Sequence, residues 1–191
     1  MSAGYKIKDL AGIYYLTLQV VHWTDVFTRQ IYRNIVIDSL KFCKENKGLD
    51  IFAFAPKTFG VSNHIHLLAK SYNGELSNTI RDLKRHTSKK IVEQVIEGRE
   101  SRREWLLNIF ESAAKQHKRN NKYQLWTHEN HPENIYSNKF IAQKITYIHD
   151  NPVTAGLVEK PEEYIYLSAK AYAGESCILD VTVLTLPWIT Y

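Results

Sequence analysis

The sequence predicts an α+β domain in which helices pack on a small sheet. Several stretches alternate apolar and polar positions or form short apolar runs, as strands do, and four longer stretches carry apolar residues at helical spacing. Two of the predicted strands follow each other with a short connection, which indicates a hairpin. With 191 residues, 44% of them apolar and 24% charged, the chain is long enough for one core and has an ordinary globular composition.

The first third of the chain predicts a strand, a helix and a hairpin. In residues 13–23, alternate side chains share one face, namely Tyr14, Leu16, Leu18 and Val20. From Thr28 to Lys47-Gly48 the spacing is helical, with Ile31 and Ile35 beside a stripe of Tyr32, Val36, Leu40 and Cys43. Residues 49–55 predict a second strand, and Pro56 and Gly60 mark a turn before a third at residues 61–68.

The rest of the chain is mainly helical. A helix at residues 76–95 has the apolar stripe Leu76, Ile80, Leu83, Thr87, Ile91 and Val95, and the next has Trp105, Leu106, Ile109, Phe110 and Ala113. Residues 123–126 predict a short strand that returns to the sheet. A last helix follows the N-cap Ser137, packs through Phe140, Ile141, Ile145 and Ile148, and ends at Asn151 because Pro152 follows. We expect residues 1–173 to form the domain and residues 174–191 a C-terminal tail packed on it.

Two histidines stand out on the third strand. Because strand side chains alternate, His64 and His66 point the same way, while Ile65 and Leu67 point into a core. Imidazole is the commonest protein metal ligand, so the pair predicts half of a metal site that needs one more ligand. The structural alternative is two histidines on a half-exposed strand. The two cysteines are far apart in the chain, so the other ligands must be oxygen or amide groups.

The last helix carries a polar row beside its packing stripe. Gln143, Tyr147 and Asn151 are spaced by four residues and therefore line up on one face. A tyrosine with an amide one turn to either side forms a polar row on a helix that is otherwise anchored by its packing stripe.

Cations cluster on the helix at residues 76–95. Only Asp82 opposes them within ten residues, and they are Arg81, Lys84, Arg85, Lys89 and Lys90. Such a run is either a solvated helix face or a surface that contacts phosphates. The formal net charge of +5 and the pI near 9.1 are compatible with a polyanionic partner but do not decide between these interpretations.

The chain predicts no membrane association. No apolar run has the ~20 residues that a membrane span needs, and the N-terminus lacks the layout of a signal peptide. We expect a cytoplasmic protein.

Several spaced motifs together resemble one family. They are Ser62-Asn63-His64-Ile65-His66-Leu67-Leu68, Trp126 with Asn130-His131-Pro132, the run from Tyr147 to Val158 that contains Asn151-Pro152, and Pro161-Glu162-Glu163-Tyr164. In this order they resemble the REP-associated tyrosine transposases, a branch of the single-tyrosine HUH transposases of bacterial insertion sequences. The resemblance covers residues 10 to 173.

The resemblance implies a fold and a reaction. The fold would be the HUH endonuclease core, a ferredoxin-like or RRM-like central antiparallel sheet flanked by helices. The enzyme would be a transposase that cleaves and rejoins single-stranded DNA at hairpin-flanked, REP-like sites through a 5′-phosphotyrosine. Its location would be the nucleoid. Tyr147 would be the nucleophile, and a divalent Mg²⁺ or Mn²⁺ would be held by His64, His66 and Asn151, with Gln143 as the alternative third ligand.

The DNA would be gripped by cations and aromatic rings. For the backbone the candidates are the five cations of the helix at residues 76–95, and for base stacking they are Trp126 or Tyr164. The sequence leaves open whether the enzyme is a monomer or a homodimer that exchanges its tyrosine helix. One departure from the family is the additional loop material at residues 55–60, which affects the approach to the site.

Two other functions remain open. One is a domesticated protein that binds hairpin or single-stranded nucleic acid without cleaving it, although the complete trio of His64, His66 and Tyr147 favours an active enzyme. The other is a metal-dependent hydrolase, which would need carboxylate ligands; Glu75 is the nearest downstream acid, and no HExxH or HD pair is present.

Overall fold

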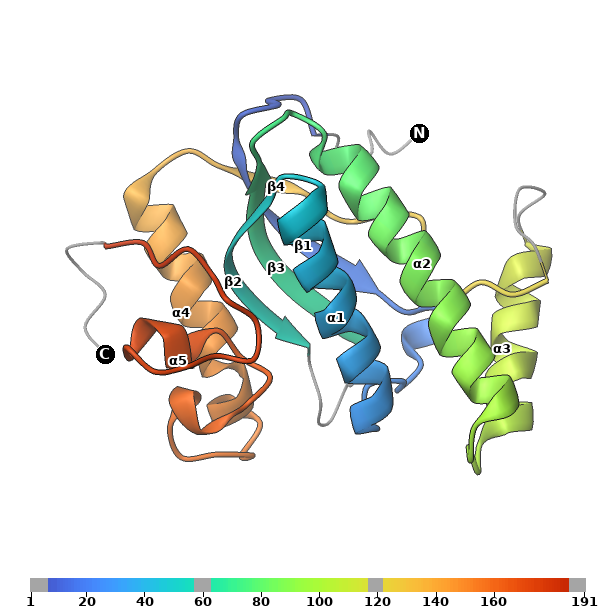
Figure 1. Ribbon diagram of the computed structural model, residues 1–191. Coiled ribbons are helices and arrows are strands. Elements are labelled where there is room, and N and C mark those ends of the chain that lie inside the picture. The colour runs from blue at the N-terminus through green and yellow to red at the C-terminus, as the bar shows by residue number, and fades with distance from the viewer. Residues whose placement is uncertain (1–6, 57–62, 117–121, 186–191) are drawn as a thin grey trace.

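A computed structural model describes residues 7–56, 63–116 and 122–185. Within them the elements are, in order, β1 (Ile13–Gln19), η1 (Val21–Trp23), α1 (Gln30–Asn46), β2 (Leu49–Pro56), β3 (His64–Ser71), α2 (Leu76–Glu97), α3 (Arg103–Lys115), β4 (Glu133–Ile135), α4 (Asn138–Thr154), η2 (Pro161–Glu163) and α5 (Ala169–Tyr172). The strands form an antiparallel sheet in the order β2-β3-β1-β4 (Figure 1). This confirms the predicted α+β fold with a central antiparallel sheet.

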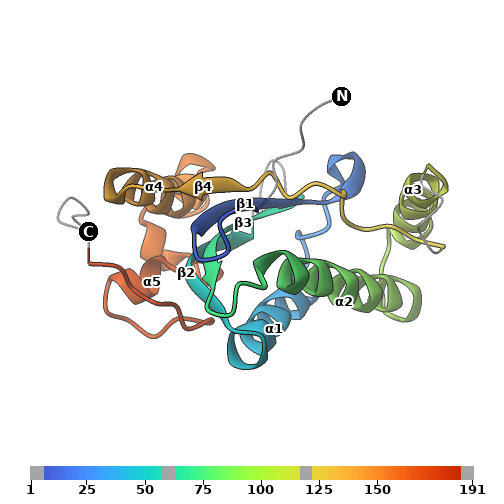
Figure 2. The ribbon, with the colours of Figure 1, turned by 90° about the horizontal axis from the view of Figure 1, so that it is seen from above.

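Helices cover both faces of the sheet. Figure 2 shows α4 on one side, and α1 and α2 on the other. The larger apolar core lies between the sheet and α1 and α2, and includes Leu16, Leu18, Ile65 and Leu67. The smaller core lies under α4 and includes Tyr15, Leu68 and Ile145. The alternation of β1 and β3 therefore divides each strand between two cores.

β1 is shorter than the sequence predicted. Val20 makes an isolated bridge to Trp126, and the chain then turns through η1, where φ is 52° at His22 and 55° at Trp23. A left-handed backbone cannot continue a strand, so the chain leaves the sheet there. The predicted strand at residues 123–126 is reduced to this bridge and its neighbouring hydrogen bonds, and the sheet edge is instead formed by β4, which the sequence did not reveal.

α4 begins where predicted but continues past Pro152. The Ser137 side chain accepts a hydrogen bond from the Phe140 amide, which confirms the N-cap. The expected end at Asn151 is wrong, because the helix runs to Thr154. The φ angle of proline suits a helix, but Pro152 has no N–H to donate to the carbonyl four residues earlier, and the helix ends two residues after it.

The helical stripes were predicted with two exceptions. The α2 stripe from Leu76 to Val95 is buried throughout. In contrast, Ile31 is 43% exposed in the first turn of α1, and Trp105 is 49% exposed near the start of α3. Each directly precedes a buried core residue, Tyr32 or Leu106, so its side chain lies on a neighbouring face of the helix that the core does not cover.

The C-terminal segment lies along the outer edge of β2. The Thr182 amide donates to the Ile51 carbonyl at 2.8 Å, and the Tyr172 hydroxyl donates to the Phe52 carbonyl at 3.0 Å. Leu179 and Val181 are buried in the larger core. An edge strand that would otherwise present unpaired backbone groups is thereby covered. Of the expected loop material at residues 55–60, positions 57–60 lie outside the described residues.

Truncation of a buried side chain on α4 should loosen the helix. Ile145 is fully buried in the smaller core, so Ile145→Ala is expected to lower the free energy of unfolding by about 2–5 kcal/mol in urea titrations. Ile31→Ala is the matched control on a half-exposed isoleucine and should cost well under half as much. Equal losses would contradict the packing of α4 described here.

Candidate metal and tyrosine site

The histidine pair lies on the α4 face of the sheet. His64 and His66 are 7% and 4% exposed, and their rings meet at 74° with centroids 4.6 Å apart. The two Nε2 atoms are 3.1 Å apart. Each Nδ1 instead faces a protein partner: Asn63 Oδ1 at 2.8 Å for His64, and the Tyr15 hydroxyl at 2.6 Å for His66.

This spacing fits two ligands of one octahedral metal ion. At a metal–nitrogen distance of ~2.1 Å, two ligands lie ~3.0 Å apart at a right angle and ~3.4 Å apart at the tetrahedral angle. The observed 3.1 Å is nearer the first value. In the described part of the chain, no group of three or more His, Cys, Asp or Glu side chains could hold a metal. A third protein ligand from these residues would therefore be of another type, such as an amide.

Tyr147 lies against the histidine pair within the same chain. Its ring centroid is 5.4 Å from that of His66 and 6.3 Å from that of Tyr15, in edge-on geometry, and the side chain is 50% exposed. A nucleophilic side chain needs this combination: its backbone is held in place, and the side chain is open to a substrate. The helix is held to the sheet on its other side by Ile141, Ile145 and Ile148.

His149 anchors the same helix. It is 1% exposed, its Nε2 lies 2.9 Å from the Ser168 hydroxyl, and that hydroxyl accepts from the Phe54 amide on β2 at 3.0 Å. Two residues after Tyr147, the helix is thus tied to the strand beside β3.

The two amide candidates are both on α4 but differ in what they contact. The Asn151 Nδ2 donates to the Tyr147 carbonyl at 2.7 Å, so its amide is held on the turn that carries the tyrosine. Gln143 is exposed one turn before Tyr147. The contact recorded for Asn151 is to the backbone of its own helix and not to the histidines.

Sequence reasoning did not assign a role to three residues at the site. Tyr15 and Asn63 contact the histidines directly. Lys144, three residues before Tyr147, places its Nζ 4.1 Å from the centre of the Tyr15 ring and 2.7 Å from Glu133. The position of Asn63 beside His64 was a visible signal. Tyr15 and Lys144 could be found only with the strand register and the docking of α4.

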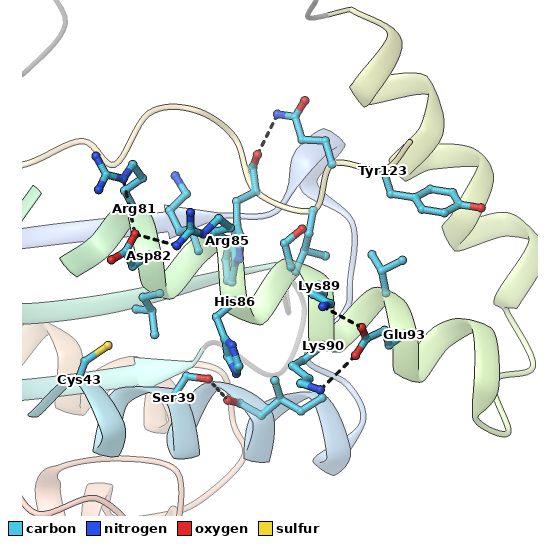
Figure 3. A pocket seen from close by; sticks show the side chains of 18 of the residues that line it. Ser39, Cys43, Arg81, Asp82, Arg85, His86, Lys89, Lys90, Glu93 and Tyr123 are labelled. Carbon is cyan, nitrogen blue, oxygen red and sulfur yellow. Dashed lines mark hydrogen bonds and ion pairs between the residues drawn. The ribbon is translucent and has the colours of Figure 1, made fainter. Parts of the chain in front are cut away.

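The cations of α2 lie on the opposite side of the sheet from the histidines. They line an open groove of about 1310 Å³ between α1, α2 and the segment 122–130. Figure 3 shows Arg81 and Arg85 at Asp82, and Lys89 and Lys90 at Glu93. The Arg81, Arg85, Lys89 and Lys90 side chains are 51–80% exposed, so these pairs contribute little to stability.

Lys84 differs from its neighbours. Its Nζ donates to the Thr127 carbonyl and to Asn130 Oδ1, both at 2.6 Å, and burial lowers its pKa to about 8. The ammonium thus ties α2 to the segment beside β1. It is better placed to hold this segment than to reach a phosphate, contrary to the expectation from the charge run.

Trp126 is not arranged for base stacking. The side chain is 5% exposed, its Nε1 donates to Thr87 Oγ1 at 2.9 Å, and its ring packs on Phe27 with centroids 5.7 Å apart. The proposed stacking role is therefore corrected: the indole is part of the larger core. Its spacing in the sequence could not separate these two roles.

These features define an α+β domain with a histidine pair on its sheet and a tyrosine on the helix above it. Among solved structures, the same fold occurs in a REP-associated tyrosine transposase bound to a REP hairpin, with a TM-score of 0.57 and 16% identity over 100% of this chain and 99% of that chain. No protein-family model and no curated protein matches the sequence. The fold expected from the resemblance is thus confirmed.

The described helices also bear on the membrane expectation. None of them is both long enough and apolar enough to cross a bilayer.

Acid should destabilise the fold through His149. Burial lowers its pKa from 6.5 to about 4, so as the pH falls the unfolded chain takes up this proton first, and stability is lost between these two values. The loss from this group should reach about 3 kcal/mol. Urea unfolding of His149→Gln should show a shallower decline over this pH range, and parallel curves for the two proteins would refute the assignment.

Proposed function

We propose that this protein is a metal-dependent transposase that cleaves and rejoins single-stranded DNA at hairpin-flanked sites through a covalent bond to Tyr147. The observation that carries the proposal is the position of the Tyr147 ring, 5.4 Å from the ring of His66, whose Nε2 forms a pair with that of His64. The solved structure of similar fold supports it, since that protein is a transposase bound to a hairpin.

The reaction exchanges one phosphodiester for another. The Tyr147 hydroxyl loses its proton, its oxygen forms a bond to the scissile phosphorus, and the bond to the 3′ oxygen breaks. The 3′ oxygen takes up a proton, which leaves a free 3′-OH and a 5′-phosphotyrosine. Attack by a 3′-OH on the phosphotyrosine reverses these steps, so rejoining needs no ATP.

His64 and His66 would hold Mg²⁺ or Mn²⁺ through their Nε2 atoms. When bound, the ion polarises the scissile phosphate and stabilises the charge that develops on its oxygens, which matters because a phenol with a pKa of ~10 is a weak nucleophile. Asn151 is the proposed third ligand. Its side-chain nitrogen donates a hydrogen bond to the Tyr147 carbonyl, and its side-chain oxygen is the type of ligand atom that these ions prefer. Gln143 is the alternative.

One chain carries all the proposed groups. Tyr147 lies beside the histidines of its own sheet, and His149 and the isoleucines of α4 hold it there. A monomer would therefore be sufficient for catalysis, and a homodimer would not be needed to complete the site.

The α2 cations would bind the DNA backbone away from the reaction centre. Arg81, Arg85, Lys89 and Lys90 are held only by weak surface pairs, which phosphates can replace. Because they lie on the opposite side of the sheet from the histidines, a DNA that touches both must pass around the sheet. A hairpin stem with a single-stranded flank is long enough to do so. Action on such DNA would bring the protein to the nucleoid.

Loss of the Tyr147 hydroxyl should abolish the covalent step. Tyr147→Phe incubated with a single-stranded hairpin oligonucleotide and Mn²⁺ should give no denaturant-resistant adduct, whereas the unmodified protein forms one that EDTA prevents. Binding of Mn²⁺ should be unchanged in the variant, because the phenol is not a proposed ligand.

Tyr136→Phe is the control for this experiment. Tyr136 is 85% exposed just before α4, so its loss should leave the adduct intact. An adduct that persists in Tyr147→Phe would remove the proposed nucleophile. Hairpin binding by the unmodified protein without any adduct would instead favour the alternative of a nucleic-acid-binding protein that does not cleave.

Removal of one α2 cation should weaken DNA binding and its salt dependence. If Lys89 contacts a phosphate, Lys89→Gln should lower the slope of log affinity against log salt by about 1. Lys115→Gln is a matched control on α3, since both lysines are 74% exposed and pair with a glutamate four residues before or after them. Equal salt slopes for the two variants would exclude Lys89 from the DNA contact.

A further inference from the structure

Each histidine of the pair is held from behind by a second side chain. Behind His64 lies Asn63, which is fully buried; its Nδ2 donates to the Trp23 carbonyl at 2.8 Å, and its Oδ1 faces His64 Nδ1 at 2.8 Å. A carbonyl oxygen can only accept, so the bond to Trp23 determines which end of the amide meets His64. The Nδ1 of His64 must therefore carry a hydrogen, which leaves a lone pair on Nε2 in the neutral ring.

Behind His66 lies a hydroxyl, which can both donate and accept. The Tyr15 hydroxyl is 2.6 Å from His66 Nδ1, and its ring stacks on the imidazole with centroids 5.4 Å apart. The Thr17 hydroxyl lies near the Tyr15 phenol, whose pKa it lowers, and its Oγ1 is 3.4 Å from the same nitrogen. His66 can thus keep a partner at Nδ1 whichever of its nitrogens carries the hydrogen.

The two arrangements correspond to two states of the site. In the metal-free site, His64 offers only a lone pair at Nε2. The 3.1 Å contact between the two Nε2 atoms therefore requires a hydrogen on Nε2 of His66, which donates it to His64. The Tyr15 hydroxyl then donates to Nδ1 of His66. A metal ion needs the lone pairs of both Nε2 atoms. The hydrogen of His66 must then move to Nδ1, where the Tyr15 oxygen accepts it, and the Tyr15 hydrogen turns away from the ring.

We propose that Asn63 and Tyr15 are positioning residues of the metal site: Asn63 keeps His64 permanently in the ligating tautomer, and Tyr15 allows His66 to change into it when metal binds. The inference rests on the proposed metal-dependent function. The inference goes beyond the proposed function in two ways. It assigns the two histidines different behaviour, and it explains why a tyrosine rather than an apolar ring lies under His66.

Metal affinity tests the role of Tyr15. Titration of the metal-free protein with Mn²⁺ should show that Tyr15→Phe, which keeps the ring, weakens binding about tenfold or more. Tyr14→Phe is the matched control: it is the adjacent residue on the other face of β1, and its hydroxyl accepts only from the Lys8 and Asp9 amides among the contacts recorded for it. This variant should bind Mn²⁺ like the unmodified protein.

Asn63 is tested by comparing two replacements. Asn63→Asp keeps an oxygen that accepts from His64 Nδ1 but loses the donor to the Trp23 carbonyl, so it should lose less Mn²⁺ affinity than Asn63→Leu, which should lose about tenfold or more. Equal losses in the two variants would contradict the proposed role of the acceptor oxygen.

The tautomers can be observed directly in the unmodified protein, which avoids any effect of substitution on folding. Long-range ¹H–¹⁵N correlation spectra at about pH 8, where ordinary histidines are neutral, should show His64 protonated at Nδ1 and His66 at Nε2. Zn²⁺, a diamagnetic probe, should move the His66 hydrogen to Nδ1 and leave that of His64 in place.

The outcomes separate this inference from the proposed function. If the unmodified protein binds no Mn²⁺ or Zn²⁺, both fail. If it binds metal but Tyr15→Phe binds within about twofold of it, or if His66 is already protonated at Nδ1 without metal, only the positioning role fails. Weaker binding in Tyr15→Phe with a normal Tyr14→Phe, together with the tautomer change, supports it.

Discussion

The pairing register between β1 and β3 is the constraint on which the site depends. It sets Thr17 opposite His66 and Gln19 opposite His64, and it places both imidazoles under α4 while Ile65 and Leu67 enter the larger core. A slip by one residue would exchange these sets. The apolar residues beneath α1 and α2 oppose such a slip, so packing on one face of the sheet preserves the arrangement of the histidine pair on the other.

Much of the fold could be predicted because its causes are local. The alternation of β1 and β3 and the helical stripes of α1, α2 and α4 reflect which residues are buried on folding, and this pattern is visible in the sequence. The same alternation indicated that His64 and His66 share a face. That Tyr147 lies above this face required the resemblance to a known fold, since no local rule joins positions about eighty residues apart.

The remaining features depend on tertiary structure. β4 has only three residues and carries no periodic signal, and β1 ends where His22 and Trp23 adopt positive φ angles. Whether Lys84 and Trp126 meet solvent depends on segment 122–130 lying beside α2. The contact of Tyr15 with His66 follows from the strand register, which the sequence pattern constrains but does not specify. Even the anchoring of α4 through His149 needs the distant Ser168.

The η1 turn has a consequence for following the site in solution. The Trp23 carbonyl accepts from Asn63, whose Oδ1 faces His64, so two hydrogen bonds separate the backbone of Trp23 from the imidazole of His64. The indole of the same residue is 64% exposed. An exposed indole is therefore linked through its own backbone and two hydrogen bonds to the buried histidines, and replacing the other three tryptophans would allow its emission to be followed alone.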